Sequence, residues 1–267
     1  MLPGLIVLDG ARSQLRQATL PCPARTILWC MCGRFARRST QQVLADWFGV
    51  DMEDMPWFAP SYNVAPQSVQ PVVRLNRDSG GREVAMLRWG LVPFWAKDAK
   101  LGYSTINARS EEAAVKPAYR DALKKRHCLV PADAFYEWQR PNSNSPAMAK
   151  QPFAIALSSG QPYAMAGLWE SWQPRDAAPL ETFTILTTDP NSLMEPIHNR
   201  MPVILAAQDY ARWLDPGDPA RPPLDLLRPY PADLMVAWPV SDRVGNVRNN
   251  DPQLLDRFQT LGAVQLR

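Results

Sequence analysis

The sequence contains few of the residues that build metal sites and disulfide frameworks. Its 267 residues include 4 cysteines and 2 histidines. Cys30 and Cys32 form a CxC pattern, and the CxxC pairs and histidine spacings of zinc sites do not occur. Because only Cys128 lies outside the N-terminal region, we expect neither a structural metal nor a set of disulfides. This cysteine usage predicts a reducing, cytoplasmic compartment.

Long apolar runs and a strong net charge are also missing. No run approaches the roughly 20 apolar residues of a transmembrane helix, so we expect no membrane contact. The opening segment MLPGLIVLDGARSQLRQ is a poor signal peptide, because its apolar part comes first and its arginines follow. A net charge of +3 permits nucleic-acid binding without requiring it, since binding normally needs a clustered basic face.

Proline, in contrast, is abundant. The chain has 27 prolines, close to twice the average usage of roughly 5%. Short β-rich runs, from HCLVPADAFYEW through MPVIL, are separated by Pro, Gly, Asn and Ser clusters. Residues 116–126 and 208–214 are expected to be helical, and residues 234–241 form a last expected strand. The pattern predicts an α+β fold: a single domain built on a curved, largely antiparallel, barrel-like β-sheet with a few short helices.

A helix is expected between residues 39 and 49. Ser39 and Thr40 can cap its start, and Gly49 can end it. Four apolar residues at helical spacing fall between these signals, namely Val43, Leu44, Trp47 and Phe48.

Four side chains with chemical potential stand beside arginines or tryptophans: Cys32, Asn107, Glu137 and His198. Each has an ordinary explanation when taken singly, as a buried thiol, a turn amide, a surface carboxylate or a hydrogen-bonded imidazole. Jointly, a thiol, a carboxylate, an imidazole and an amide suffice for carbonyl chemistry. The neighbouring arginines are Arg34, Arg109 and Arg200, and they could bind phosphates or carboxylates.

Trp95 and Trp138 offer flat surfaces on which bases could stack. Such stacking contributes roughly 1–3 kcal/mol per base. The chain has 10 tryptophans, and most are expected in the core, as in the GLW run that ends at Trp169.

A set of motifs occurs in a fixed order along the chain: MCGRFA, YNVAP, RWGLVPFW, INARSE, CLVPADAFYEW, PFAIA, IHNRMPVIL and PVSDRVGNVRN. In these motifs and in their order, the chain resembles the SOS-response-associated peptidase (SRAP) family of abasic-site processing proteins. The resemblance runs from Met31 to about Asn250, nearly the whole chain.

The resemblance implies a sensor of abasic sites in single-stranded DNA or at single-strand/double-strand junctions. It implies a covalent thiazolidine crosslink to the ring-opened sugar, formed by a cysteine left N-terminal when the initiator Met is removed. By motif match, Cys32 is the nucleophile and Asn107 holds the sugar oxygen. Glu137 assists ring opening, with its pKa raised if it lies in an apolar pocket beside tryptophan, and His198 assists Schiff-base formation and reversal.

The same resemblance assigns the remaining site residues to DNA binding. Arg34, Arg109 and Arg200 would contact the phosphates that flank the lesion, and Trp95 and Trp138 would interrupt or support base stacking there. It implies single-stranded DNA that contains abasic sites as the binding partner, and we expect no cofactor and no metal. We expect a monomer in the cytoplasm, associated with the nucleoid when it is bound to DNA.

The position of Cys32 departs from the family pattern. An internal cysteine has its nitrogen in a planar amide, so it could form no thiazolidine. We therefore expect residues 1–30 to be an unmatched extension, residues 31–255 the SRAP domain and residues 256–267 a tail. Either translation begins at Met31, or the extension is a propeptide cleaved before Cys32, with autoproteolysis as one route.

Two other functions use the same residues. An N-terminal cysteine could serve a peptidase or amidohydrolase, with the α-amine as base toward the thiol. Alternatively, the protein could be a non-catalytic reader of modified or single-stranded DNA in which Cys32 is merely packed. A crosslink to abasic DNA that survives denaturation would distinguish the abasic-site function from the peptidase and from the non-catalytic reader.

Overall fold

A computed structural model describes residues 33–53, 55–76, 78–139, 150–175, 177–215 and 217–258. Three sequence predictions therefore fall outside the described residues in whole or in part: Cys32, the extension 1–30, and the tail 256–267 beyond residue 258.

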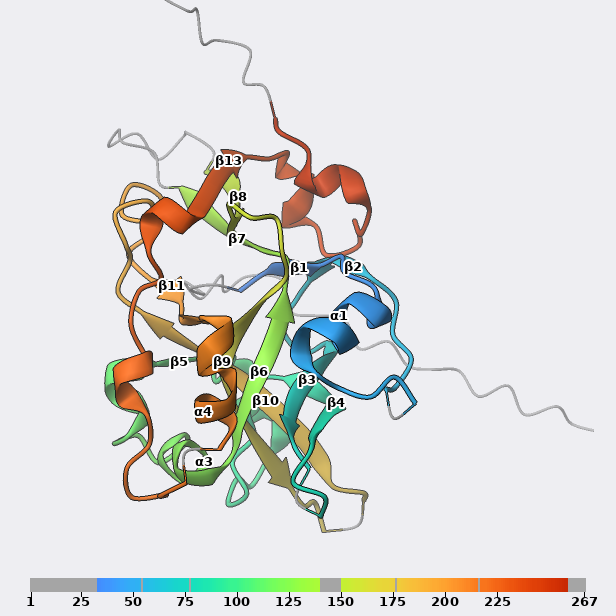
Figure 1. The fold of residues 1–267 in the computed structure, drawn as a ribbon, viewed down its shortest axis with the longest axis vertical. Coiled ribbons are helices and arrows are strands. Elements are labelled where there is room, and N and C mark those ends of the chain that lie inside the picture. The colour runs from blue at the N-terminus through green and yellow to red at the C-terminus, as the bar shows by residue number, and fades with distance from the viewer. Residues whose placement is uncertain are drawn as a thin grey trace, which may run out of the picture. The chain divides into compact units, whose positions relative to one another are not determined.

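Five strands close into a barrel (Figure 1). They are β3 (Val69–Leu75), β4 (Arg82–Trp89), β6 (His127–Ala132), β9 (Tyr163–Trp172) and β10 (Leu180–Thr188). Neighbours pair in the order β10-β4-β3-β6-β9, and β9 pairs again with β10, which closes the ring. Only β4 and β10 run parallel within it, with Thr182 opposite Arg88. The predicted barrel-like, largely antiparallel sheet is confirmed.

Three short strands extend the barrel along β9 and β10. β5 (Asn107–Arg109) lies parallel to β10, with Asn107 opposite Ile185. β11 (Met201–Pro202) pairs with the end of β10, and β12 (Ile204–Leu205) pairs with β9. Since β4 and β5 both pair in parallel with β10, the chain between them leaves the barrel wall and returns to it.

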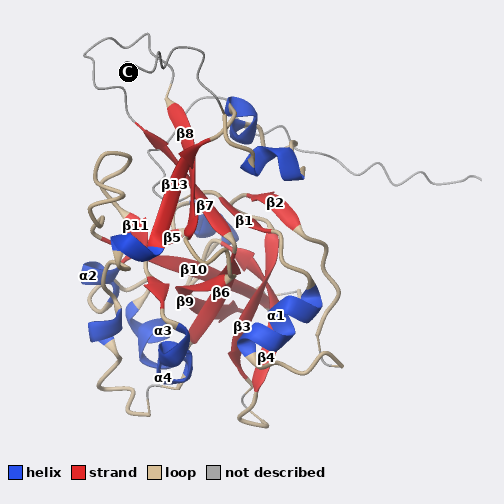
Figure 2. Cartoon of the chain, turned by 45° about the horizontal axis from the view of Figure 1, so that its top comes forward, coloured by secondary structure: helices blue, strands red, loops and turns tan. Residues whose placement is uncertain are grey.

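A second sheet of five antiparallel strands begins where β6 ends. Its order is β13 (Met235–Pro239), β8 (Gln151–Leu157), β7 (Ala134–Gln139), β1 (Phe35–Arg37) and β2 (Ser61–Val64). Asp133 alone separates β6 from β7, and its carboxylate accepts hydrogen bonds from the backbone and hydroxyl of Ser39. Figure 2 shows β7, β8 and β13 continuing away from the barrel strands.

The helices are short. They are α1 (Gln41–Phe48), α2 (Ser110–Ala113), α3 (Arg120–Lys125) and α4 (Tyr210–Leu214), with single 3₁₀ turns at Ala99–Tyr103, Ala207–Asp209, Leu224–Leu226, Ala232–Leu234, Asp242–Gly245 and Pro252–Leu255. The predicted start and end of α1 are confirmed, because Thr40 accepts a hydrogen bond from the Val43 backbone and Gly49 adopts φ 62°. The third helix begins at Arg120, after the turns that contain Pro117.

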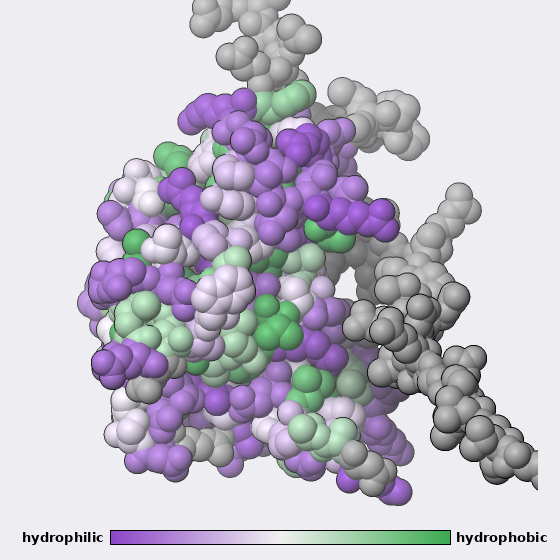
Figure 3. Space-filling model, turned by 90° about the vertical axis from the view of Figure 1, so that its right-hand side faces the viewer, coloured by the Kyte–Doolittle hydropathy of each residue, from purple (hydrophilic) through white to green (hydrophobic). Residues whose placement is uncertain are grey.

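The burial along α1 differs from the prediction in one respect. Leu44 and Phe48 are buried, whereas Val43 and Trp47 are exposed. All four residues lie at helical spacing, but only one side of the helix contacts the barrel. That side carries Leu44 and Phe48, and Val43 and Trp47 lie beside it. Figure 3 views the side on which α1 lies and shows apolar patches separated by hydrophilic residues.

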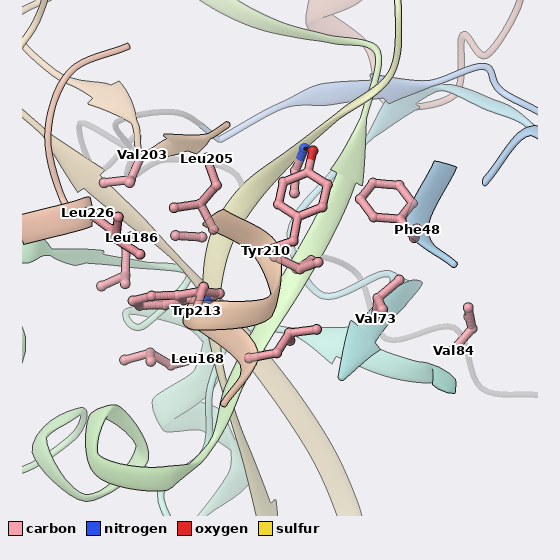
Figure 4. Close-up of a cluster of buried hydrophobic side chains, with 14 of the residues drawn as sticks. Phe48, Val73, Val84, Leu168, Leu186, Val203, Leu205, Tyr210, Trp213 and Leu226 are labelled. Atoms are coloured by element: carbon pink, nitrogen blue, oxygen red, sulfur yellow. Dashed lines mark hydrogen bonds between the residues drawn. The ribbon is translucent and has the colours of Figure 1, made fainter. Parts of the chain in front are cut away.

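The strands of the barrel bury both faces, as expected when a wall is covered on each side. One face packs against the helices, and Figure 4 shows Phe48 of α1 beside Tyr210 of α4, whose ring centroids lie 5.4 Å apart. Trp213 donates a hydrogen bond from its indole to the Cys128 carbonyl at 3.0 Å. The other face fills the barrel with side chains that include Val72, Trp89, Cys128, Val130, Phe183 and Ile185.

The second sheet directs Glu137 toward the barrel. Because side chains alternate along a strand, Ala134 and Tyr136 of β7 join a small outer core with Ala36, whereas Phe135 joins the core of the barrel interior. Glu137 shares the face of Phe135, so it points toward the side of the sheet that meets the end of the barrel.

Candidate functional site

Glu137 is a carboxylate buried between strands. Only 2% of the residue is exposed, and its cross-strand neighbour on β8 is Phe153. On the other side, the Tyr136 backbone N–H donates to the Arg34 carbonyl at 2.9 Å. The antiparallel register of β1 and β7 places Phe35 opposite Phe135 and Ala36 opposite Ala134.

His198 lies in the loop of residues 189–200, which joins β10 to β11 and is called here the His198 loop. Its backbone N–H donates to the Met194 carbonyl at 2.8 Å, and Asn191 fastens the loop to Tyr230 through a 2.7 Å hydrogen bond. The imidazole Nδ1 lies 3.2 Å from the Arg200 backbone N–H, which can donate to it. A neutral ring that accepts this bond carries its proton on Nε2.

The carboxylate and the imidazole meet at the end of the barrel. Glu137 Oε1 and His198 Nδ1 are 4.0 Å apart, close enough for an ion pair when the ring is protonated and longer than a hydrogen bond. Gln139 of the same strand donates to the Pro196 carbonyl at 3.0 Å, which joins β7 to the His198 loop. Both side chains are shielded from water, with 3% and 13% exposed. Proton transfer in such a site is protected from bulk solvent.

Asn107 begins β5 and lies beside the same strand that leads into the His198 loop. β10 pairs with Asn107 at Ile185 and with Arg109 at Thr187, and the loop starts two residues later. The Tyr119 hydroxyl donates to the Asn107 carbonyl at 3.1 Å, which holds the backbone of β5 from the side of α3. Three of the four predicted chemical residues are thus described: Glu137 lies in β7, Asn107 begins β5, and His198 lies in the loop that follows β10.

The three predicted phosphate-binding arginines have different surroundings. Arg109 has a half-exposed guanidinium, 3.9 Å from Glu112. Arg34 donates to the Asn63 side chain at 2.9 Å and the Val244 carbonyl at 2.7 Å, and its guanidinium carbon lies 5.8 Å from the Trp138 ring centroid. Burial lowers the pKa of Arg34. Its charge is therefore already partly enclosed by protein.

Arg200 is the most enclosed of the three, with 6% of the residue exposed. Its guanidinium donates to the Asp189 and Glu111 carboxylates, each at 2.8 Å, and to the Thr187 carbonyl at 2.7 Å. These contacts fasten both ends of the His198 loop to β10 and to the start of α2. In this arrangement Arg200 supports the position of His198, and its phosphate-binding role stays a prediction.

Trp95 lies in a turn after β4, and Trp138 lies at the end of β7. Trp95 is 48% exposed, whereas Trp138 is partly buried and packs over Arg34. Two further exposed aromatic residues, Phe94 and Tyr103, occur in the same excursion between β4 and β5. Sequence reasoning did not single them out, although Phe94 belongs to the RWGLVPFW motif.

Asn63 is another residue that the sequence reasoning missed. Its amide donates to three backbone carbonyls, those of Val244 at 3.2 Å, Asn246 at 3.1 Å and Asn249 at 2.8 Å. It thereby holds the segment 241–249 against β2 and Arg34. The motifs could have pointed to this residue, because Asn63 belongs to the YNVAP motif and the segment that it holds belongs to the PVSDRVGNVRN motif.

Within the described ranges, no three side chains of His, Cys, Asp or Glu gather as a metal site would require. Cys128 is buried, and burial raises the pKa of its thiol far above the ordinary value. That thiol is therefore not a candidate nucleophile. The described helices include none with the length and apolar character needed to cross a membrane.

Comparison with known sequences identifies the family to which the chain belongs. The profile of the family described as SOS response associated peptidase (SRAP) matches residues 31–247. The chain belongs to the SRAP family. It is 44% identical over 229 residues to the abasic site processing protein YoaM of Bacillus subtilis, covering 85% of this chain and 98% of that protein. It is 36% identical over 232 residues to the abasic site processing protein HMCES of Xenopus tropicalis, covering 76% of this chain and 67% of that protein.

Solved structures share the SRAP fold described above. A Bacteroides thetaiotaomicron protein superposes with a TM-score of 0.71 at 26% identity, covering 84% of this chain and 100% of that chain. A phage-related protein of Bordetella bronchiseptica superposes with a TM-score of 0.62 at 29% identity, covering 78% of this chain and 94% of that chain.

Proposed function

We propose that this SRAP protein processes abasic sites in DNA by forming a covalent crosslink to the lesion through Cys32. The observation that carries the proposal is the shielded Glu137–His198 pair, 4.0 Å apart at the end of the barrel. Membership of the SRAP family and the names of the relatives, which are abasic site processing proteins, support the choice of substrate.

The position of Gly33 supports the choice of nucleophile. Gly33 directly precedes Arg34, whose carbonyl accepts a hydrogen bond from the backbone N–H of Tyr136, the residue before Glu137 on β7. Cys32 is the residue bonded to Gly33, so the proposal assigns its thiol and α-amine to a substrate held beside the Glu137–His198 pair.

The proposed reaction begins with the closed hemiacetal of the abasic sugar. Glu137 moves the proton that opens the ring to the aldehyde, while the Asn107 amide holds a sugar oxygen. The α-amine of Cys32 attacks the aldehyde carbon, and loss of one water molecule, with His198 moving protons, leaves an imine. The thiol then adds to the imine carbon and the nitrogen gains a proton, which closes the five-membered thiazolidine.

The proposed DNA contacts are sequence-tolerant. An abasic sugar has no base to read, so phosphate contacts and stacking supply the affinity, and binding depends on salt. The half-exposed Arg109 can reach a phosphate directly. Arg200 can do so if a phosphate replaces Glu111 or Asp189, whose side chains are 52% and 83% exposed. Arg34 would contribute where DNA approaches Trp138. We propose single-stranded DNA as the substrate and a monomer as the form that binds it.

The chemistry requires Cys32 to be the first residue of the active protein. The family match begins at residue 31, and 229 aligned residues of this chain cover 98% of YoaM. Both facts support an active domain that starts at Met31, followed by removal of Met31. Self-cleavage before Cys32, a peptidase reaction in keeping with the family description, is the second route. Intact mass of the native protein distinguishes them, because self-cleavage requires a precursor that retains residues 1–30.

The proposal is tested with an oligonucleotide that carries a true abasic site. Protein that starts at Met31 is incubated with it beside protein that starts at Met1, and both are separated under denaturing conditions. We expect a shifted, denaturation-stable band from the first, and none from its Cys32→Ala variant. A stable protein that retains residues 1–30 and still crosslinks would overturn the mechanism, and a wild-type protein that binds without crosslinking would favour a non-catalytic reader.

A further inference from the structure

The exposed rings of Phe94 and Trp95 are carried by a tight turn. Residues 93–96, called here the aromatic turn, are closed by a hydrogen bond from the Ala96 N–H to the Pro93 carbonyl at 2.9 Å. Phe94 is 54% exposed and Trp95 is 48% exposed. Large exposed aromatic side chains at adjacent positions lose favourable burial unless something binds them.

Side chains of β9 and β10 hold the backbone of this turn through hydrogen bonds. Glu170 accepts a hydrogen bond from the Phe94 N–H at 3.1 Å, and the Trp172 indole donates to the Ala96 carbonyl at 2.7 Å. Just before the turn, the Val92 N–H donates to the Thr182 hydroxyl at 2.8 Å. The turn is therefore bound on both sides to β9 and at its base to β10.

Burying the carboxylate of Glu170 beneath the turn carries a desolvation cost. It is 1% exposed, and its other oxygen lies 2.5 Å from the Arg126 guanidinium, which is also largely enclosed. Burial raises the pKa of Glu170 above its ordinary value despite the nearby Arg126. A buried ion pair contributes little net stability compared with apolar packing, so the hydrogen bond to the aromatic turn is the feature that the carboxylate adds.

The aromatic turn is directly connected to the proposed site. The Leu91 N–H donates to the Thr105 carbonyl at 3.3 Å, and the Thr105 hydroxyl donates to the Leu91 carbonyl at 2.5 Å. The excursion that carries the rings is thus closed at its base, two residues before Asn107. These two hydrogen bonds link the segment that leads into the aromatic turn to the segment that leads into β5.

We infer that Glu170 is a positioning residue that, with Trp172, holds Phe94 and Trp95 as a rigid two-ring platform for unpaired bases beside the lesion. The inference rests on the proposed function and adds Phe94 as a second stacking ring. Preorganised rings bind bases without the entropy cost of ordering the loop.

The test measures stacking separately from crosslinking. A single-stranded oligonucleotide carries a tetrahydrofuran abasic analogue, which has no aldehyde, and 2-aminopurine in the nucleotides that flank it. Stacking on the rings changes the fluorescence of 2-aminopurine. We expect Phe94→Ala, Trp172→Phe and Glu170→Ala each to reduce this change and to weaken binding at least about fivefold, the low end for one base stack. Trp57→Ala, which removes an 80% exposed ring outside the turn, is the matched control and should leave both unchanged.

Thermal unfolding of each variant separates positioning from folding. Phe94 is at the surface, and Trp172→Phe keeps an aromatic ring, so these two variants decide the matter if Glu170→Ala fails to fold. Unchanged fluorescence in folded Trp172→Phe and Phe94→Ala would overturn the inference, as would an equal loss in Trp57→Ala. Failure of the proposed function is seen independently, as absence of crosslinking by wild-type protein to a true abasic site.

Discussion

The two histidines of the chain occupy opposite kinds of surroundings. His127 begins β6, stacks on Trp213 with ring centroids 4.2 Å apart, and lies 2.6 Å from the Leu123 carbonyl, to which its Nε2 can donate. His198 lies in a loop beside a carboxylate. The imidazole is the same in both, so its neighbours decide whether it stabilises the fold or is available for chemistry.

The comparison extends to the regions around each ring. The flank around His127 is built from strands and helices whose apolar residues recur with regular spacing, and burial lowers the pKa of that histidine. The His198 loop contributes Met194 and Ile197 to the core and is held by specific hydrogen bonds that include those of Arg200, Asn191 and Gln139. Regular packing gives stability around His127, whereas specific hydrogen bonds hold His198 in position beside Glu137.

The largest expected effect is the loss of crosslinking rate when the Glu137 carboxylate beside His198 is replaced. Glu137→Gln keeps the shape of the side chain and removes its proton-transfer capacity, so crosslinking should slow by about 10²–10⁴-fold. Binding to DNA that carries a tetrahydrofuran analogue should be nearly unchanged. Crosslinking rate and affinity are measured side by side, and an equal loss of both would show a structural role.

Exchanging the two histidines for the same residue sharpens the comparison. His198→Gln should slow crosslinking by about 10²-fold with little effect on the melting temperature, because the substitution leaves the buried apolar residues of the loop, Met194 and Ile197, in place. His127→Gln should lower the free energy of unfolding by about 1–3 kcal/mol through lost ring packing. The folded fraction of that variant should crosslink at the wild-type rate. Thermal melts and crosslinking time courses on both variants check this pair, and a slow His127 variant would contradict the separation.

A smaller effect is expected for the arginines. Arg109→Ala should weaken binding alike for all sequences and make the salt slope shallower by about 1, the signature of one lost phosphate contact. Arg200→Ala should do the same if a phosphate replaces its carboxylate partners. Loss of melting temperature at an unchanged salt slope would instead show that Arg200 only anchors the His198 loop. Binding isotherms at several salt concentrations supply the slopes, and Arg212→Ala, whose Asp225 pair is on the surface, is the control.

The smallest effect concerns pH. Because the pKa of His127 is lowered from its ordinary value of 6.5, the unfolded chain binds more protons than the folded protein as the pH falls below 6.5. Stability should therefore decrease on acidification in that range. The difference in free energy of unfolding between wild type and His127→Gln should shrink as the pH falls below 6.5, since other groups titrate equally in both proteins. A constant difference would contradict the buried, neutral state of the ring.

Much of the fold was predictable from local sequence. Thr40 and Gly49 mark the ends of α1 because a cap acceptor and a left-handed residue act within a few residues of the chain. The alternation of β7 likewise separates Tyr136 from Phe135. The closure of the barrel was predictable only in outline, because the pairing of β9 with β10 and the parallel contact of β4 with β10 join distant segments.

The sequence predicted which residues belong to the site better than it predicted how they are arranged. Motifs pointed to Glu137 and His198, yet their 4.0 Å separation depends on how the second sheet meets the barrel. The enclosure of Arg200 by Asp189 and Glu111 could not be read from an arginine beside a histidine. Neither could the support of Phe94 by Glu170, since nothing local to GLWESW shows that its carboxylate turns inward.

By itself, then, the sequence determined the family, the fold class and the kinds of side chain that the chemistry needs, because motifs and periodicity are local properties of the chain. The tertiary structure alone decided which of those side chains share a buried site, which arginine remains half-exposed and which rings are held outward. Those outcomes depend on contacts between residues far apart in sequence, where burial and hydrogen bonding set the charge and position of each group.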